Sequence, residues 1–136
     1  MVLLLGISFN DSLINMAGLD SLKYANSEFY FLVNDMLEDL TGFQSLLLIG
    51  DYLSFHANHS MVSLNGVGSL QYIEKLIIDD NDALSDISAL ENLDAESLID
   101  LTIMENDMLS DCDILPICEY LVAPNGTIQI YNNAPG

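Results

Sequence analysis

The sequence contains no arginine and only two lysines, Lys23 and Lys75, against 21 acidic residues, which gives a net charge of −19 at pH 7. Proteins that bind nucleic acid use lysine and arginine to neutralise phosphates, so we expect no nucleic-acid partner. The same excess of negative charge disfavours binding to an anionic membrane surface. It predicts a self-repelling surface that attracts cations.

Long hydrophobic runs are also missing. No stretch reaches the roughly 20 apolar residues that span a bilayer, and we therefore expect no membrane insertion. The opening run Met1–Leu5 is apolar, but it lacks the basic start and the long apolar region of a signal peptide. We interpret this run as the first strand of the fold.

Tryptophan is absent, and there are only three prolines and two cysteines. Two cysteines are too few to indicate a redox compartment. The sequence is instead rich in apolar residues, with 51% hydrophobic residues in 136 positions. That composition is not typical of a disordered chain, and the length is typical of one domain. We therefore expect residues 1–136 to form a single domain.

An asparagine recurs at intervals of 23 to 27 residues along the whole chain. Apolar residues stand five and three positions before each of these asparagines. They are Leu5, Phe29, Leu53, Leu76, Leu101 and Ile128 in the first column, and Ile7, Phe31, Phe55, Ile78, Ile103 and Ile130 in the second. Alternation with a period of two predicts one short, half-buried strand in every repeat.

After each asparagine the apolar period changes to three, as in Leu37, Leu40, Phe43 and Leu46. A period of three suits 3₁₀ turns and tight extended segments better than a long α-helix. A small residue follows eight positions after four of the asparagines, where it lets the backbone turn tightly or approach its neighbour. These small residues are Gly18, Gly42, Gly66 and Ala89.

One repeat of this kind cannot bury its apolar residues alone, whereas stacked repeats can. We predict an α/β solenoid, a right-handed superhelix with a parallel sheet of six short strands on one face. Turns, 3₁₀ segments or short helical segments form the other face. The repeats cover about residues 5–28, 29–52, 53–75, 76–100, 101–127 and 128–136.

The recurring asparagines fall where the chain leaves each strand and backbone groups lose their partners in the sheet. An inward-pointing amide can donate and accept there, and buried polar groups persist when they are satisfied in this way. We expect a structural ladder of stacked side chains; the alternative is a row of ligand-binding amides. The ladder residues are Asn10, Asn34, Asn58, Asn81, Asn106 and Asn133.

Two strings of the sequence resemble the leucine-rich-repeat signature. They are Ile73-x-x-Leu76-x-Ile78-x-x-Asn81 and Leu98-x-x-Leu101-x-Ile103-x-x-Asn106. The next apolar residue falls three positions after the asparagine instead of two. That variant, together with segments 31–43 and 109–133, resembles the receptor L-domain-like repeats of secreted bacterial surface proteins of the type IX secretion type.

This resemblance implies the C-terminal portion of a repeat array in a longer bacterial protein. It implies an extracellular or cell-surface location and neighbouring domains of the same chain. It does not imply a particular ligand or a reaction.

The outward-pointing strand positions are the strongest functional candidate, because solenoids use the sheet face as a recognition surface. Large apolar and aromatic side chains are unusual on an inert face. A structural explanation is an alternative to ligand binding, since isoleucine and tyrosine favour strand pairing. A third interpretation is that another part of the longer chain packs on this face. The candidate binding residues are Tyr30, Leu32, Ser54, His56, Ile77, Asp79, Thr102, Met104, Gln129 and Tyr131.

We therefore expect a non-catalytic extracellular recognition or adhesion module that binds a protein or a glycan through this face. The alternative is a structural spacer that displays a neighbouring domain and has no ligand of its own. No nucleophile elbow, phosphate-binding loop or zinc-protease motif occurs in the sequence. We accordingly expect no enzyme activity and no catalytic residues.

Cys112 and Cys118 occupy the plus-six and plus-twelve positions of the fifth repeat, and both are therefore expected to point inward. A disulfide between them is one interpretation, which export would permit. Two free buried thiols, or a bond from Cys118 to a cysteine elsewhere, are the others. No Cys-x-x-Cys pair is present, so no metal or redox site is expected here.

Acidic residues cluster on the turns after Asn81 and Asn106, and stacking would place these turns side by side. Oxygen-rich turns of this kind are the ligands that calcium prefers. There is no EF-hand spacing and no glycine-rich calcium repeat. We expect no cofactor, with calcium on the acidic turns as an alternative to loose cation association, and we interpret His56 and His59 as surface histidines.

Overall fold

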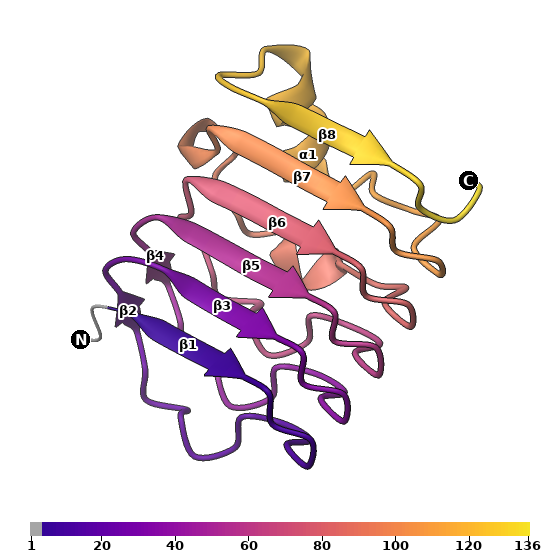
Figure 1. Cartoon of the computed structure of the whole chain (residues 1–136). Coiled ribbons are helices and arrows are strands. Elements are labelled where there is room, and N and C mark those ends of the chain that lie inside the picture. Colours follow the sequence, from indigo (N-terminus) through magenta and orange to yellow (C-terminus); the bar gives the residue numbers. More distant parts are fainter. Residues whose placement is uncertain (1–3) are drawn as a thin grey trace.

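The computed structural model describes residues 4–136, and six of its strands form one sheet in which every neighbouring pair is parallel (Figure 1). Sequence order is also spatial order. The strands are β1 (Leu5–Ser8), β3 (Phe29–Leu32), β5 (Tyr52–His56), β6 (Lys75–Asp79), β7 (Asp100–Met104) and β8 (Ile128–Tyr131). Because each turn of the chain adds one strand beside the last, the predicted solenoid is confirmed.

The register of the sheet matches the two predicted columns of apolar residues. Leu53 pairs with Leu76, and Phe55 pairs with Ile78. The same pairing continues through every neighbouring pair of strands. Register is fixed in this way because a slip of one residue would turn every buried side chain toward solvent.

The side opposite the strands contains short elements. They are β2 (Tyr24–Ala25) and β4 (Leu48–Ile49), two 3₁₀ turns η1 (Ser88–Leu90) and η2 (Ala95–Ser97), and the helix α1 (Leu115–Val122). The 3₁₀ turns and the short helix confirm the prediction. The parallel pair β2–β4 was not predicted, because two-residue strands are too short to produce a visible alternation.

The core lies between the sheet and these short elements. Its centre is a cluster of four phenylalanines, in which Phe31 stacks on Phe55 with ring centroids 5.2 Å apart and Phe29 meets Phe43 edge-on at 5.1 Å. All four side chains are buried. Leucine and isoleucine occupy the corresponding positions in the later repeats, so burial of apolar area is continuous along the stack.

The asparagine ladder is present as predicted. In each step the side-chain amide and the backbone N–H of one asparagine both donate to the Oδ1 of the next, and the amide contacts span 2.9 to 3.3 Å. The amide nitrogens from Asn34 onward also donate to a strand carbonyl of the preceding repeat, as Asn81 does to Phe55 at 3.1 Å. Within residues 4–136, no buried side-chain nitrogen or oxygen lacks a partner.

The residue before each ladder asparagine adopts a left-handed backbone conformation, which the sequence did not indicate. These residues have φ between 52° and 58°, and they are Phe9, Val33, Ala57, Asp80, Glu105 and Asn132. The conformation is unfavourable for most L-residues. It is held because the N–H at this position still donates to the neighbouring strand, as Val33 does to the His56 carbonyl at 3.0 Å.

Of the glycines at the plus-eight positions, Gly42 and Gly66 make the close approach that the sequence suggested. Gly18, Gly42 and Gly66 all have φ between 105° and 122°. A Cβ on Gly42 would lie 1.9 Å from the Met16 carbonyl oxygen, whereas one on Gly18 would meet nothing within 4 Å. Only glycine fits where one repeat packs this tightly on the previous one.

The fifth repeat departs from the predicted period of three. The helix α1 begins at Leu115 with Pro116 in its first turn, as its sequence favours. A helical period then decides which side chains are buried, and Ile117 and Tyr120 fill the core. Leu115 is 63% exposed. Cys118 is also exposed, so the prediction that it points inward is wrong, whereas Cys112 is half-buried.

Both ends of the described chain show apolar residues at the surface. The core-side residues of β8, Ile128 and Ile130, are 38% and 39% exposed. Strand β1 begins at Leu5, and residues 1–3 of the opening apolar run lie outside the described part of the chain. No helix among residues 4–136 is long and apolar enough to cross a membrane.

Candidate functional site

The structure brings all ten predicted binding residues onto one face of the main sheet, in two columns that cross β3 to β8. One column runs Tyr30, Ser54, Ile77, Thr102, Gln129, and the other runs Leu32, His56, Asp79, Met104, Tyr131. Residues paired in this way lie about 4.8 Å apart across neighbouring strands. We call this surface, defined by these ten residues, the outward face.

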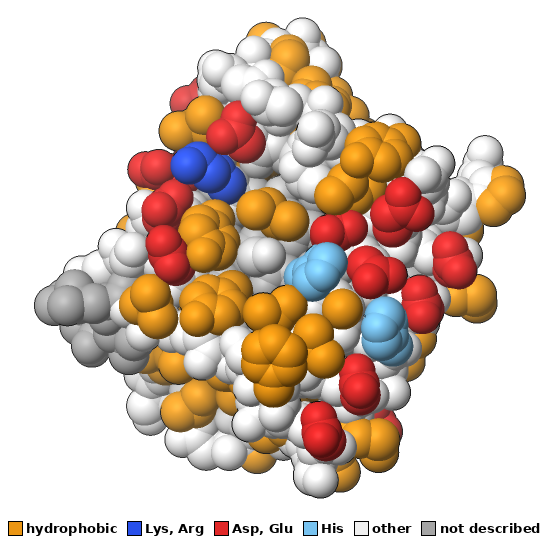
Figure 2. Space-filling model, viewed as in Figure 1, with side chains coloured by type: hydrophobic (Ala, Val, Ile, Leu, Met, Phe, Trp, Pro, Cys, Tyr) orange, Lys and Arg blue, Asp and Glu red, His pale blue; other side chains and the backbone are white. Residues whose placement is uncertain are grey.

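Apolar side chains occupy the middle of the outward face, and Figure 2 shows them gathered over the strands. Tyr131 is 47% exposed, whereas Tyr30, Leu32, Ile77 and Met104 are half-buried among their neighbours. The Tyr30 ring lies over Gly6, so closely that a Cβ on Gly6 would fall 2.3 Å from the ring. A glycine in β1 therefore leaves room for this aromatic side chain to lie flat along the sheet.

Two polar residues of the outward face are held by each other. The His56 Nδ1 lies 2.8 Å from an Asp79 carboxylate oxygen, and the His56 side chain is 45% exposed while that of Asp79 is 18% exposed. A contact of this length fixes both side chains across β5 and β6. Thr102 and Gln129 make a longer contact, 3.5 Å between Thr102 Oγ1 and Gln129 Oε1, on β7 and β8.

A third outward column, which the prediction missed, borders the face at the start of the strands. It includes Tyr52, Lys75 and Asp100, each the first residue of its strand. Burial and a hydrogen bond with Glu28 raise the pKa of Tyr52, and Lys75 Nζ lies 3.6 Å from Asp51. The alternation that predicted the two central columns, extended two residues backward, would have found these positions.

Acidic residues border the other side of the face, beyond the ends of the strands. Figure 2 shows red side chains along both edges of the apolar centre. On the far edge, the turns around the asparagine ladder carry Asp35, Asp80, Asp82, Glu105 and Asp107, next to Asp79 at the end of β6. The outward face therefore carries a band of apolar residues on β3, β6, β7 and β8, which Ser54 and the His56–Asp79 pair interrupt, and acidic residues lie along both of its sides.

A candidate set of metal ligands is formed by His59 on the turn after β5 together with Asp80 and Asp82 on the turn after β6. One ligand atom each from His59, Asp80 and Asp82 lie within 4.8 Å of one another. His59 Nδ1 is already 3.1 Å from Asp82 Oδ2, and both of these side chains are well exposed. An imidazole with two carboxylates suits a transition metal better than calcium, which prefers oxygen ligands only.

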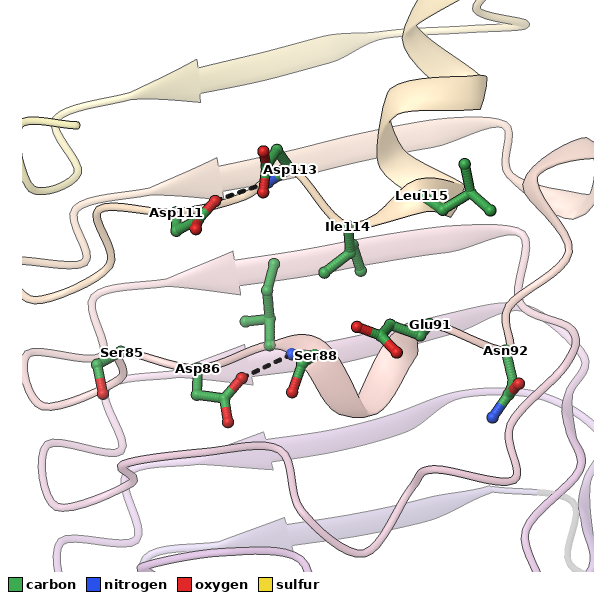
Figure 3. A pocket seen from close by; sticks show the side chains of 10 residues that line it. Ser85, Asp86, Ser88, Glu91, Asn92, Asp111, Asp113, Ile114 and Leu115 are labelled. Atoms are coloured by element: carbon green, nitrogen blue, oxygen red, sulfur yellow. Dashed lines mark hydrogen bonds between the residues drawn. The ribbon is translucent and has the colours of Figure 1, made fainter.

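A concave region lies on the opposite side of the molecule, between the turn around η1 and the segment before α1. This groove of about 470 Å³ is lined by side chains from both segments, including Asp86, Glu91, Asp111 and Asp113. Figure 3 shows them facing one space with the strands of the main sheet behind. The turns that follow Asn81 and Asn106 are thus side by side, as predicted.

The two aspartates before α1 act on each other. The Asp113 N–H donates to Asp111 Oδ1 at 3.2 Å. Hydrogen bonds from Asp113 hold the pKa of Asp111 below its usual value, and the hydrogen bond with Asp111 raises the pKa of Asp113. Both carboxyls are exposed, so solvent screens their charge, and what the groove offers chemically is a weak attraction for cations.

The two cysteines are free thiols in the structure and are not bonded to each other. Cys112 is half-buried, whereas Cys118 is exposed on α1. Burial raises the pKa of the Cys112 thiol, and the negative charges of Asp111 and Asp113 raise it further. The charged neighbours of Cys112 are thus acidic, whereas a basic neighbour is the feature that makes a cysteine reactive.

The fold defines a class of protein, a parallel solenoid with one strand per turn and an asparagine ladder at the strand ends. No protein-family model, curated protein or solved structure gives a significant match to the chain. Its function therefore has to be argued from the outward face and from the surrounding charge.

Proposed function

We propose that this chain is a leucine-rich-repeat module of the receptor L-domain-like type, and that its outward face recognises a protein or a glycan. The observation that carries the proposal is the contiguity of the face. Aromatic, aliphatic and hydrogen-bonding side chains lie on five neighbouring strands in fixed register. Extended sheet faces of this kind are the surfaces that solenoids use for binding.

The repeat pattern supports the leucine-rich-repeat assignment. The inward residues of each strand, the ladder asparagine and the apolar residue three positions later all recur in the order of that signature, in its plus-three variant. The resemblance to secreted bacterial surface proteins supports an extracellular or cell-surface location. It also supports neighbouring domains in a longer chain.

We propose that the module is not catalytic. The groove with the most carboxylates is open, and its acidic side chains are exposed. General acid–base chemistry relies on groups whose pKa values are shifted by exclusion from water. The outward face, by comparison, offers shape and hydrogen-bonding groups that suit recognition.

A binding screen tests this function. The wild-type chain is applied to arrays of glycans and of cell-surface proteins, together with the variants Ile77→Asp and Val62→Asp. Ile77 lies at the centre of the outward face, whereas Val62 is 52% exposed on the arc after β5. We expect a ligand whose binding falls at least tenfold with Ile77→Asp and is unchanged with Val62→Asp, at equal thermal stability of the variants.

If no ligand discriminates between these two variants, the face is not a recognition surface. The chain would then act as a spacer that only extends or displays a neighbouring domain.

A further inference from the structure

We propose that the partner of the outward face is a basic amphipathic helix of another protein, laid along the apolar band across the strands. This inference rests on the function proposed above and names the class of ligand. It follows from three properties of the face: an apolar centre, acidic borders on both sides, and the distance between those borders.

The apolar residues of the outward face are complementary to a partner with one apolar side. Leu32 and Tyr30 lie on β3, Ile77 on β6, Met104 on β7 and Tyr131 on β8, while β5 contributes the polar Ser54 and His56. From β3 to β8 the band crosses four strand spacings, which is about 19 Å. A ligand without apolar groups would leave these side chains in water.

The acidic borders are complementary to a partner with positive charge. At the start of the strands lie Glu28, Asp51 and Asp100, and Lys75 is the one lysine among them, paired with Asp51 at 3.6 Å. Beyond the ends of the strands lie the five acidic residues of the ladder turns, next to Asp79 at the end of β6, and of these six Asp79 and Asp82 contact histidines. The remaining carboxylates of that border have no cationic partner among residues 4–136.

Complementary borders of this kind steer a charged partner into one orientation. A cationic partner gains attraction on both sides of the band. A neutral partner of the same shape would have to remove water from these carboxylates without pairing them, which is unfavourable.

The distance between the borders fits a helix. Five residues of strand separate the column of Tyr52, Lys75 and Asp100 from the ladder turns, which is about 17 Å. A helix with its side chains is about 10–12 Å wide, so lysines or arginines on both flanks can reach both borders. A band of about 19 Å accommodates roughly 13 helical residues, a length at which apolar anchors recur on one side of a helix.

A designed peptide tests the inference. The probe is a 14-residue helix with leucines on one side and lysines on both flanks, and its binding is measured by calorimetry at low and at physiological salt. One control peptide has the same composition in scrambled order, and a second control peptide has glutamate in place of lysine. Binding sites are mapped by amide chemical shifts of the labelled protein.

We expect the amphipathic basic peptide to bind the outward face. Its affinity should fall at least fivefold from low to physiological salt. Ile77→Asp should weaken binding about tenfold, and the charge-removing pair Asp100→Asn with Glu105→Gln should weaken it about threefold. Glu91→Gln, which removes an exposed carboxylate on the opposite side, should leave binding unchanged.

Equal binding of the scrambled peptide would overturn the inference, since attraction to an acidic surface without shape would then explain the result. Binding of the glutamate peptide would overturn it as well. If a neutral glycan or an uncharged polypeptide binds the face independently of salt, the proposed function stands and the basic-helix partner is wrong. If Ile77→Asp weakens the binding of no ligand, both proposals fail.

Discussion

The side-chain amide of Asn34 donates to Asn58 Oδ1 at 3.0 Å, and the backbone N–H of Asn34 donates to the same oxygen at 3.1 Å. One side-chain oxygen thus satisfies two donors of the preceding repeat. The amide nitrogen of Asn58 meanwhile donates to the Phe31 carbonyl of that repeat at 3.1 Å. Each repeat therefore satisfies hydrogen-bonding groups of its neighbour. A single repeat without neighbours would leave these groups unpaired.

The first prediction concerns this ladder. Asn81→Leu or Asn106→Leu should lower the free energy of unfolding by on the order of 1–3 kcal/mol, because buried backbone N–H and C=O groups lose their partners. Both side chains are fully buried. Thermal and urea unfolding measure the effect. Asn10→Leu, at the exposed end of the ladder, is the control and should cost less; unchanged unfolding of the two central variants would contradict the ladder's structural role.

A second prediction compares two glycines with the same backbone conformation. Gly42→Ala and Gly18→Ala both place an alanine at positive φ, which costs about 1 kcal/mol in each case. Only at Gly42 does the added Cβ also collide with the carbonyl of Met16. Gly42→Ala should therefore be clearly more destabilising in urea unfolding. Equal losses would show that the repeats are less tightly packed than the structure indicates.

The third prediction is a stabilising change. Val33 is a β-branched residue with φ of 52°, a conformation that asparagine tolerates much better. Val33→Asn should raise the free energy of unfolding by about 1 kcal/mol. Val62→Asn, at an exposed position without positive φ, is the matched control and should not stabilise. A loss of stability in Val33→Asn would mean that the valine side chain contributes more packing than its backbone costs.

The fourth prediction uses the pKa of Cys112. Because burial and the neighbouring carboxylates raise this pKa, less thiolate is present at a given pH, and alkylation should be slow. In Cys118→Ser the remaining Cys112 should react slowly, with a pH midpoint above that of a free cysteine. Cys112→Ser leaves the exposed Cys118, which should react faster.

Removing a nearby charge tests the cause of this shift. In Cys118→Ser, Asp111→Asn should lower the pKa of Cys112 and move the alkylation midpoint to lower pH. Thiols that react only after reduction would show instead that the two cysteines are bonded in solution.

The main sheet could be predicted because one alternation of side chains repeats six times in register. The ten residues of the outward face follow from that alternation alone. The strands themselves extend one residue farther back in β5, β6 and β7, and this is why the column containing Tyr52 and Lys75 was missed. Counting two residues back from Ser54 and Ile77 along the same alternation would have placed both on this face.

The rest of the fold depends on interactions that leave little trace in the sequence. The left-handed residues before the ladder include Val33 and Ala57, which no local preference would place there. They are held by hydrogen bonds to the next strand. In the fifth repeat the helix α1 replaces the period of three, so Ile117 enters the core and Cys118 does not.

The central claim is that the outward face of the main sheet is the recognition surface. The most direct test is a chemical-shift map of the isotope-labelled chain with the strongest ligand from the array screen. We predict that the shifted amides cluster on β3, β5, β6, β7 and β8, around Ile77 and Met104. Shifts that cluster instead around Asp111 and Asp113 in the opposite groove, or no saturable shifts at all, would contradict the account.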